Sequence, residues 1–198
     1  MSLSGSDYYR LRGLMNKNIL KLVLSAMFLA IALLLPFLTG QIPQVGKMLL
    51  PMHIPVILCG FICGWEHGTV VGYTAPLFRG LIFSNPIFFP TGIIMAFELA
   101  AYGAFAGLIY NKIKCPKIPR IYLSLLSSMV LGRLVKCVVQ FVVLGFTDEG
   151  FVFSAFIAGA FVNAVPGIIV QLVLIPIVMF TLEKTRFIPI KERKKNNG

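Results

Sequence analysis

Two apolar stretches, separated by a short polar link, decide the fold. Residues 49–64 read LLPMHIPVILCGFICG, and residues 68–83 read GTVVGYTAPLFRGLIF. Both are short, and Pro51, Pro55 and Pro76 interrupt them. A helix needs roughly 20 residues to cross the hydrocarbon core of a bilayer. We therefore expect these two segments to be tilted, bent or partly covered by neighbouring helices.

Further apolar runs flank these two stretches. Of the 198 residues, 58% are hydrophobic and 13% are charged, and mean hydropathy is +0.88. In soluble domains about a quarter of the residues are charged. The low charged fraction of this chain therefore predicts an all-α membrane protein with one compact domain. Six transmembrane helices are predicted, at about residues 18–38, 48–64, 68–83, 91–110, 121–146 and 153–182.

The two ends of the chain differ from this domain in composition. Residues 1–14 are polar and precede Met15, and we expect a disordered leader added ahead of the fold. No cleavable signal peptide is evident. The membrane domain is predicted over residues 15–186, followed by a basic cytoplasmic tail over residues 187–198.

Basic residues gather on one side of the predicted spans. Of the 18 lysines and arginines, 14 lie at or before the start of the first span, between the fourth and fifth spans, or after the sixth. The opposite loops hold Lys47 and the acidic pair Asp148 and Glu149. This positive-inside pattern predicts that both termini face the cytoplasm. The same pattern explains the net charge of +11, because the basic residues would lie next to anionic lipid. Nucleic-acid binding is not needed to explain this charge.

Small residues recur at every fourth position in several spans. Ala26 and Ala30 form such a pair in the first span, and glycines repeat at this spacing over residues 60–72. Gly103 and Gly107 do so in the fourth span. Small residues at this spacing let membrane helices approach closely. Most are expected to pack internally, whereas the alanine pair, on a helix with large apolar residues elsewhere, is a candidate surface for another membrane subunit.

Motifs of common enzyme classes are absent from the sequence. It contains no G-x-x-x-x-G-K-[ST] loop, no H-E-x-x-H, no G-x-S-x-G and no paired intramembrane aspartates. The four cysteines lack the spacing of a metal site, and His53 and His67 are isolated. We expect no enzyme activity, catalytic residue, metal or cofactor. For His53, a structural role or a weak substrate contact is expected.

The chain resembles a known transporter family. Six spans in under 200 residues, the Ala26–Ala30 pair and the proline- and glycine-rich segment over residues 49–83 are similar to the substrate-binding S component of an energy-coupling factor (ECF-type) vitamin transporter. The resemblance covers nearly the whole chain after Met15, and the segment over residues 49–83 is its most specific part.

The resemblance implies a binding subunit of an ABC importer in the bacterial cytoplasmic membrane. Such a component binds a vitamin or related micronutrient with high affinity near the extracellular side and topples in the membrane to release it. A transmembrane coupling subunit and two ATPase subunits supply the energy, which accounts for the missing nucleotide loop. On this chain, Ala26 and Ala30 would lie on the face that meets the coupling subunit.

Four charged residues lie inside apolar spans, where charge is costly and usually marks a ligand or ion site. At about 1.5 Å of rise per helical residue, Arg79 is expected near the outer end of its span and Arg133 near the middle of its own. Glu98 and Lys136 are expected in the outer halves of their spans.

Polar residues share helix faces with these charges, at spacings of i, i+4 in the fourth span and i, i+3, i+7 in the fifth. Such faces are predicted to converge on one outward site. The predicted substrate-binding residues are Arg79, Glu98, Tyr102, Arg133, Lys136, Gln140, Asn163 and Gln171. By the family resemblance, the neighbouring loops would add Gln41, Gln44, Asn85, Phe88 and Phe151.

A structural role is the alternative for each of these charges. Arg79 or Arg133 could pair with Glu98 to hold helices together, or cap backbone carbonyls that the prolines free. Lys136 could extend outward along its alkyl stem.

The charge balance indicates the chemistry of the ligand. Three cations face one carboxylate, and an acidic ligand would accept charge-assisted hydrogen bonds from them. We therefore expect a small acidic micronutrient, with a pantothenate-like acid as first example. The alternative ligand is a neutral aromatic vitamin or precursor, of flavin or benzimidazole type, stacked on Phe88, Tyr102 and Phe151. A stand-alone secondary transporter or channel, and a structural or assembly protein, are the other function classes.

Overall fold

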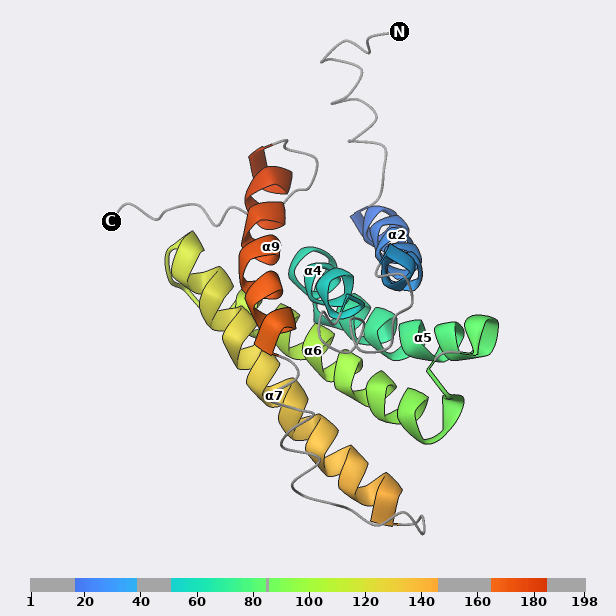
Figure 1. Cartoon of the computed structure of the whole chain (residues 1–198). Helices are drawn as coiled ribbons and strands as arrows, with labels where there is room; N and C mark the ends of the chain where they lie inside the picture. The colour runs from blue at the N-terminus through green and yellow to red at the C-terminus, as the bar shows by residue number, and fades with distance from the viewer. Residues whose placement is uncertain (1–16, 39–50, 85, 146–164, 185–198) are drawn as a thin grey trace, which may run out of the picture.

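Six α-helices make up the part of the chain that the structure, a computed structural model, describes: residues 17–38, 51–84, 86–145 and 165–184. The prediction of an all-helical protein is confirmed for these residues. A π-helical turn, Phe88–Gly92, leads into the fourth α-helix. The α-helices are α2 (Lys17–Leu38), α4 (His53–Cys63), α5 (Trp65–Phe83), α6 (Ile93–Lys112), α7 (Lys117–Gly145) and α9 (Val165–Lys184) (Figure 1).

The prolines of the second predicted span explain why α4 is short. Pro51 and Met52 form a turn, and the helix begins only at His53. Pro55 falls in the first turn of α4, where backbone N–H groups have no partner within the helix and proline is tolerated. Gly64 alone joins α4 to α5, with φ of 104°, a conformation that favours glycine.

The helices differ in how well they suit a bilayer. Within the described ranges, three segments are long and apolar enough to cross a membrane: Asn18–Phe37, Phe88–Lys112 and Lys117–Val143. His53–Cys63 and Pro166–Leu182 are shorter apolar helices. α5 belongs to neither group, because glycines, a glutamate, a histidine and an arginine dilute its apolar residues. It packs against α2, α4 and α6, which bury its glycines and Arg79.

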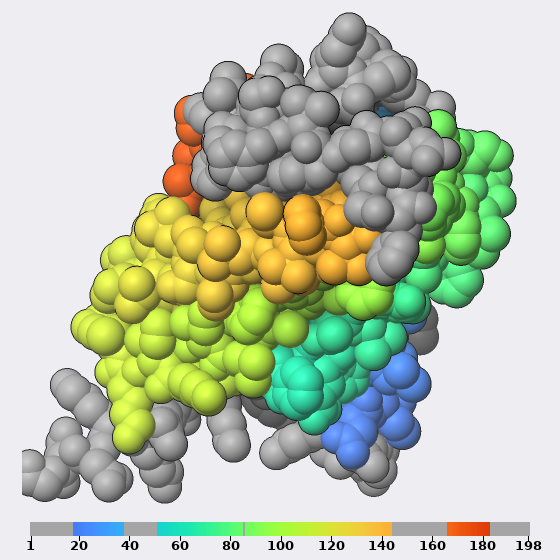
Figure 2. Space-filling model, turned by 90° about the horizontal axis from the view of Figure 1, so that it is seen from below, coloured from blue at the N-terminus to red at the C-terminus, as the bar shows by residue number. Residues whose placement is uncertain are grey.

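The central helix of the bundle is α6. It packs against α4 and α5 and also against α7, while α2 lies on α4 and α5, and α9 contacts α7 and α4 (Figure 1). Figure 2 shows α7, in yellow to orange, lying along the light green of α6. The largest fully buried side chains among the described residues come from five helices and include Ile57, Pro76, Leu99, Leu125 and Ile175.

At the crossing of α4, α5 and α6, only glycine fits. A Cβ atom at Gly68 would lie 2.7 Å from the Gly60 Cα and 2.8 Å from the Gly103 carbonyl oxygen. A Cβ atom at Gly107 would lie 2.6 Å from the backbone nitrogen of Trp65. The glycine ladders therefore pack against one another, as the spacing predicts for membrane helices in backbone contact.

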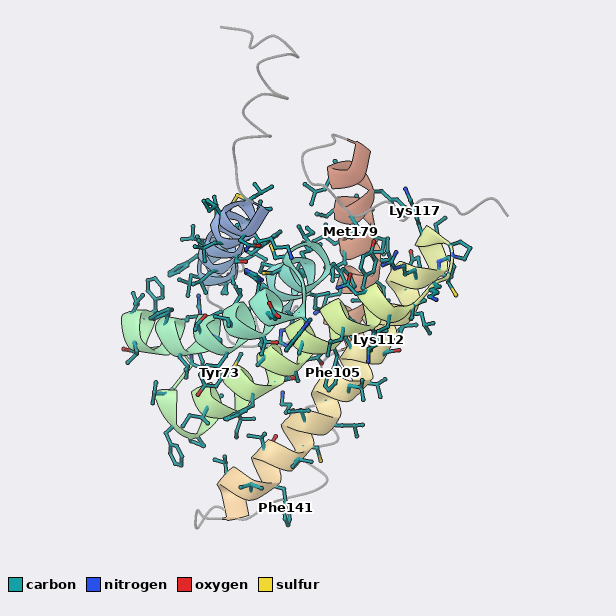
Figure 3. The ribbon with its side chains drawn as sticks, turned by 180° about the vertical axis from the view of Figure 1, so that it is seen from behind. Tyr73, Phe105, Lys112, Lys117, Phe141 and Met179 are labelled. Atoms are coloured by element: carbon teal, nitrogen blue, oxygen red, sulfur yellow. The ribbon has the colours of Figure 1, made fainter. Side chains whose placement is uncertain are left out.

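The two ends of α7 differ in chemistry. Figure 3 shows Lys112 and Lys117 near the turn between α6 and α7, and Phe141 toward the far end of α7. Near this turn, Arg120 Nε donates to the Tyr110 carbonyl oxygen at 2.6 Å, and the guanidinium lies 4.1 Å from the centre of the Tyr110 ring. The contact gives a hydrogen-bond donor to a carbonyl in the last turn of α6, where no backbone N–H group of the helix is available.

We expect Gly68→Ala to destabilise the protein by about 2 kcal/mol, because the added methyl group must push two backbones apart. The matched control on the same helix is Gly80→Ala, whose Cβ atom would lie 3.1 Å from the Pro86 carbonyl oxygen and needs only a small shift. Thermal unfolding in detergent, followed by circular dichroism, compares the two. Equal melting temperatures for both variants would contradict the backbone contact.

Candidate functional site

A carboxylate buried inside the bundle is the centre of the candidate site. Glu98 on α6 is 3% exposed, and its Oε2 lies 2.9 Å from Nζ of Lys136 on α7. The Lys136 side chain is 26% exposed, so the ammonium group reaches the carboxylate from a more open position. A buried charge is tolerated when it is paired and hydrogen-bonded. This ion pair therefore joins α6 to α7.

The other carboxylate oxygen faces a histidine. Nε2 of His53, the first residue of α4, lies 3.8 Å from Glu98 Oε1, too far for a hydrogen bond. His53 is 1% exposed, and neither ring nitrogen has a hydrogen-bond partner in the described part of the chain. The sequence indicated an isolated histidine. The structure corrects this, because α4 and α7 pack against the same helix and bring both side chains to one carboxylate.

Tyr102, one turn further along α6, extends the site. Its ring meets that of His53 edge-on, with centroids 4.8 Å apart. A Cβ atom at Gly132 on α7 would come within 2.9 Å of the Tyr102 ring, so α7 can lie against the tyrosine only where it has no side chain. Arg133 on α7, which is half-buried, lies close to Tyr102. The helix faces of α6 and α7 that the spacing predicts therefore meet.

The remaining predicted residues are more scattered. Gln171 on α9 is 1% exposed, and its side-chain nitrogen has no hydrogen-bond partner among the residues described. Gln140 is half-buried on α7, and Phe88 is 45% exposed ahead of α6. Other predicted residues lie outside the described ranges: Gln41, Gln44, Asn85, Phe151 and Asn163.

Arg79 contacts α2 and the end of its own helix. Its Nη1 donates to the Leu33 carbonyl oxygen at 3.1 Å, and its guanidinium lies 5.2 Å from the centre of the Phe37 ring and 5.9 Å from that of Phe83. Pro36 lacks an N–H group and disturbs the carbonyls one turn before it. Arg79 thus donates to the Leu33 carbonyl, next to that of Ala32, which Pro36 leaves without its intrahelical donor. Its contact with a substrate stays a prediction.

Arg79 is also distant from Glu98 along the bundle. α5 and α6 pack in opposite directions, because Gly68 lies against Gly103 and Gly72 lies against Leu99. Glu98 is therefore near the level of Gly72, and Arg79 lies seven residues, or about 10 Å, further along α5.

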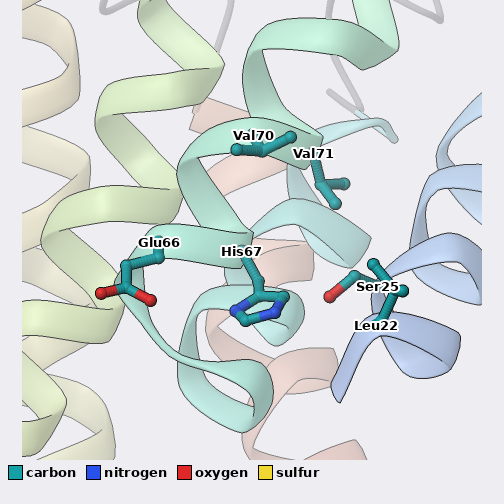
Figure 4. Close-up of a pocket in the computed structure, with 6 residues that line it drawn as sticks. All are labelled: Leu22, Ser25, Glu66, His67, Val70 and Val71. Atoms are coloured by element: carbon teal, nitrogen blue, oxygen red, sulfur yellow. The ribbon is translucent and has the colours of Figure 1, made fainter. Parts of the chain in front are cut away.

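A groove opens on the surface between α2 and α5. Its volume is about 270 Å³, and Figure 4 shows its His67 between Glu66 on one side and Ser25 on the other. No residue of the buried cluster lines this groove. Ala26 and Ala30 on α2 are exposed. The complete lining is Leu22, Ser25, Glu66, His67, Val70 and Val71.

The buried cluster holds charged and hydrogen-bonding groups without a nucleophile activated by a base, so it suits recognition of a polar molecule. A family model described as "ECF transporter, substrate-specific component" matches residues 20–179. The chain belongs to this family. Neither a curated protein nor a solved structure matches it.

Membership of the ECF transporter family settles several expectations. The protein is a multi-pass membrane protein and the substrate-specific component of an ECF transporter, and it is not an enzyme. It acts with a substrate and with the ECF module. The resemblance seen in the sequence is confirmed, and the matched region includes both the Glu98 cluster and the alanine pair of this ECF component.

Lys136→Gln should destabilise the ECF component by about 3 to 5 kcal/mol, because it leaves a buried carboxylate without its cation. Adding Glu98→Gln should recover most of the loss, since two amides can hydrogen-bond to each other. Thermal unfolding of the wild type, both single variants and the double variant gives the coupling energy. A coupling energy near zero would mean that the ion pair does not hold α6 to α7.

Proposed function

We propose that the cluster around Glu98 binds the substrate, and that the substrate is a small organic acid of the vitamin or micronutrient class, such as a pantothenate-like acid. The observation that carries this proposal is the charge of the cluster. Lys136 is matched by Glu98, and Arg133 adds a second cation within one turn of Lys136. A substrate carboxylate would accept charge-assisted hydrogen bonds from such cations.

The position of Arg79 reduces the number of cations that lie near Glu98. From the sequence, three cations stand against one carboxylate, a surplus of two. Arg79 contacts α2 and lies about 10 Å along the bundle from the level of Glu98. Among the described residues, the cations beside Glu98 are then Lys136 and Arg133 on α7, and either could meet an acidic group of the substrate.

The site is proposed to open toward the outside, in a bundle of six membrane spans with both termini in the cytoplasm. His53 begins α4, and Lys136 lies in the second half of α7. Lys136 lies 19 residues along α7 from Lys117, and His53 lies at the start of α4, so both are remote from the basic turn around Lys112 and Lys117. The positive-inside rule supports placing that turn in the cytoplasm, which leaves the substrate site toward the outer surface.

The exposed Ala26–Ala30 face of α2 is proposed to dock a transmembrane coupling subunit, with two ATPase subunits completing the importer. Both alanines are exposed, and the groove residue Leu22 lies one turn before Ala26 on the same helix. Small side chains let a partner helix approach the backbone. ATP is then handled by the partners.

A neutral aromatic substrate is less well supported. Tyr102 is 1% exposed, and its ring already meets His53 and the backbone at Gly132. Little ring face is left on which a flavin-like molecule could stack. The acidic substrate is therefore the better match.

Native mass spectrometry of the protein as purified should reveal a bound acid. Pantothenate serves as the first titration probe, and an acid found by mass spectrometry replaces it. Conversion of the carboxylate to an amide should weaken binding at least tenfold, about 1.4 kcal/mol, because the charge-assisted bonds are lost. Arg133→Gln should reduce that difference, whereas Lys112→Gln, at an exposed position, should not. An amide that binds as tightly as its acid would contradict an acidic substrate.

Ala26→Trp and Ala30→Trp should abolish co-purification with the coupling and ATPase subunits, because an indole prevents close helix approach. Retention of bound substrate should be unchanged. Val130→Trp is the matched control, since Val130 is 61% exposed on α7, away from α2. Continued assembly of both alanine variants would exclude this face as the docking surface.

A further inference from the structure

His53 is the least satisfied polar side chain near the buried carboxylate. It is 1% exposed, and both ring nitrogens lack a hydrogen-bond partner within the described ranges. A buried polar group left without a partner costs about 1 to 3 kcal/mol. Packing does not require an imidazole at this position. An apolar ring would fill the same space against Tyr102 and would leave no buried nitrogen without a partner.

The imidazole is nevertheless held in a definite place. Its ring packs edge-on against Tyr102, with centroids 4.8 Å apart, and its Nε2 faces Glu98 Oε1 at 3.8 Å. Lys136 engages the other carboxylate oxygen, Oε2, at 2.9 Å. The ion pair therefore orients the carboxylate, and Oε1 is the oxygen turned toward the histidine.

The separation of 3.8 Å is too long for a direct hydrogen bond and suits one shared atom. A single oxygen at about 2.8 Å from both Nε2 and Oε1 fits this spacing. That oxygen must accept a hydrogen bond from the imidazole N–H and donate one to the carboxylate. A hydroxyl group can do both, whereas a carboxylate would be repelled by Glu98 and an ether oxygen could not donate.

We propose that His53 and Glu98 form a hydroxyl-recognition pair in the substrate site, so that the substrate is a hydroxy acid. The inference rests on the proposed acid-binding function and deepens it. The substrate hydroxyl donates to Glu98 Oε1 and accepts from His53 Nε2–H, while its carboxylate is held by Arg133. His53 is then a specificity-determining residue, and Lys136 positions the carboxylate that accepts the hydrogen bond from the hydroxyl group.

The hydroxyl is tested with chemically matched probes. The full-length protein is titrated with pantothenate, which carries two hydroxyl groups, and with the two analogues in which one hydroxyl is replaced by hydrogen. Loss of the recognised hydroxyl should weaken binding about 10- to 100-fold, because a charged acceptor and an imidazole are left unpaired in a buried site. If native mass spectrometry identifies a different acid, that acid and its deoxy form replace these probes.

The role of the histidine is tested by substitution. His53→Phe should weaken binding of the hydroxy acid to a similar extent and no longer distinguish it from the deoxy form. His53→Gln should retain part of the discrimination, since its terminal amide reaches about as far as Nε2. The matched control is His67→Gln, the other histidine of the chain, which lines the surface groove instead.

The melting temperature of the ligand-free protein separates recognition from a structural role. His53→Phe should leave it unchanged or raise it, because it removes an unpaired buried imidazole. A lower melting temperature, together with equal binding of hydroxy and deoxy acids, would overturn the inference in favour of a structural, water-bridged histidine.

The remaining outcomes also decide between the two proposals. Equal binding of hydroxy and deoxy acids, with amides still rejected, would overturn the hydroxyl pair and leave the acid-binding function standing. A co-purified acid without a hydroxyl would do the same. Failure of the purified protein to bind any acid would overturn the acid-binding function and the hydroxyl pair with it.

Discussion

Backbone contact between glycines sets the position of everything else in this bundle. Gly60, Gly68 and Gly103 bring α4, α5 and α6 so close that a single methyl group would collide with a neighbouring backbone. Lipid tails are as apolar as the helices, so close packing and not hydrophobicity holds such helices together. The three helices therefore form a unit, and Glu98 is buried because α6 lies at its centre.

Burial of Glu98 then determines what its neighbours can be. Lys136 offsets the carboxylate charge, and Gly132 lets α7 approach Tyr102 closely enough for that pairing. His53 contributes imidazole nitrogens that have no partner in the described structure. The glycine contacts thus make a rigid frame, while the groups gathered within it retain unused hydrogen-bonding capacity. That combination is expected of a binding site built on rigid elements.

Much of this could be predicted from the sequence, because periodicity and charge act locally. The helices, the glycine ladders and the shared faces of Glu98 with Tyr102 and of Arg133 with Lys136 follow from spacing within one helix. Contacts between helices leave no such signal. Nothing in the spacing showed that His53 lies beside Glu98, or that Arg79 lies with α2. Both depend on which helices are neighbours, which the glycine crossing decides.

The weak apolar character of α5 has a consequence for biogenesis. Glu66, His67 and Arg79 make this segment a poor substrate for insertion into lipid on its own, since each polar side chain at bilayer depth adds to the insertion cost. The glycine joint at residue 64 ties α5 directly to the strongly apolar α4. The two helices are therefore best delivered to the membrane as one hairpin, in which α5 buries its glycine-rich face and Arg79 and leaves apolar side chains such as Leu81 and Ile82 on the outside.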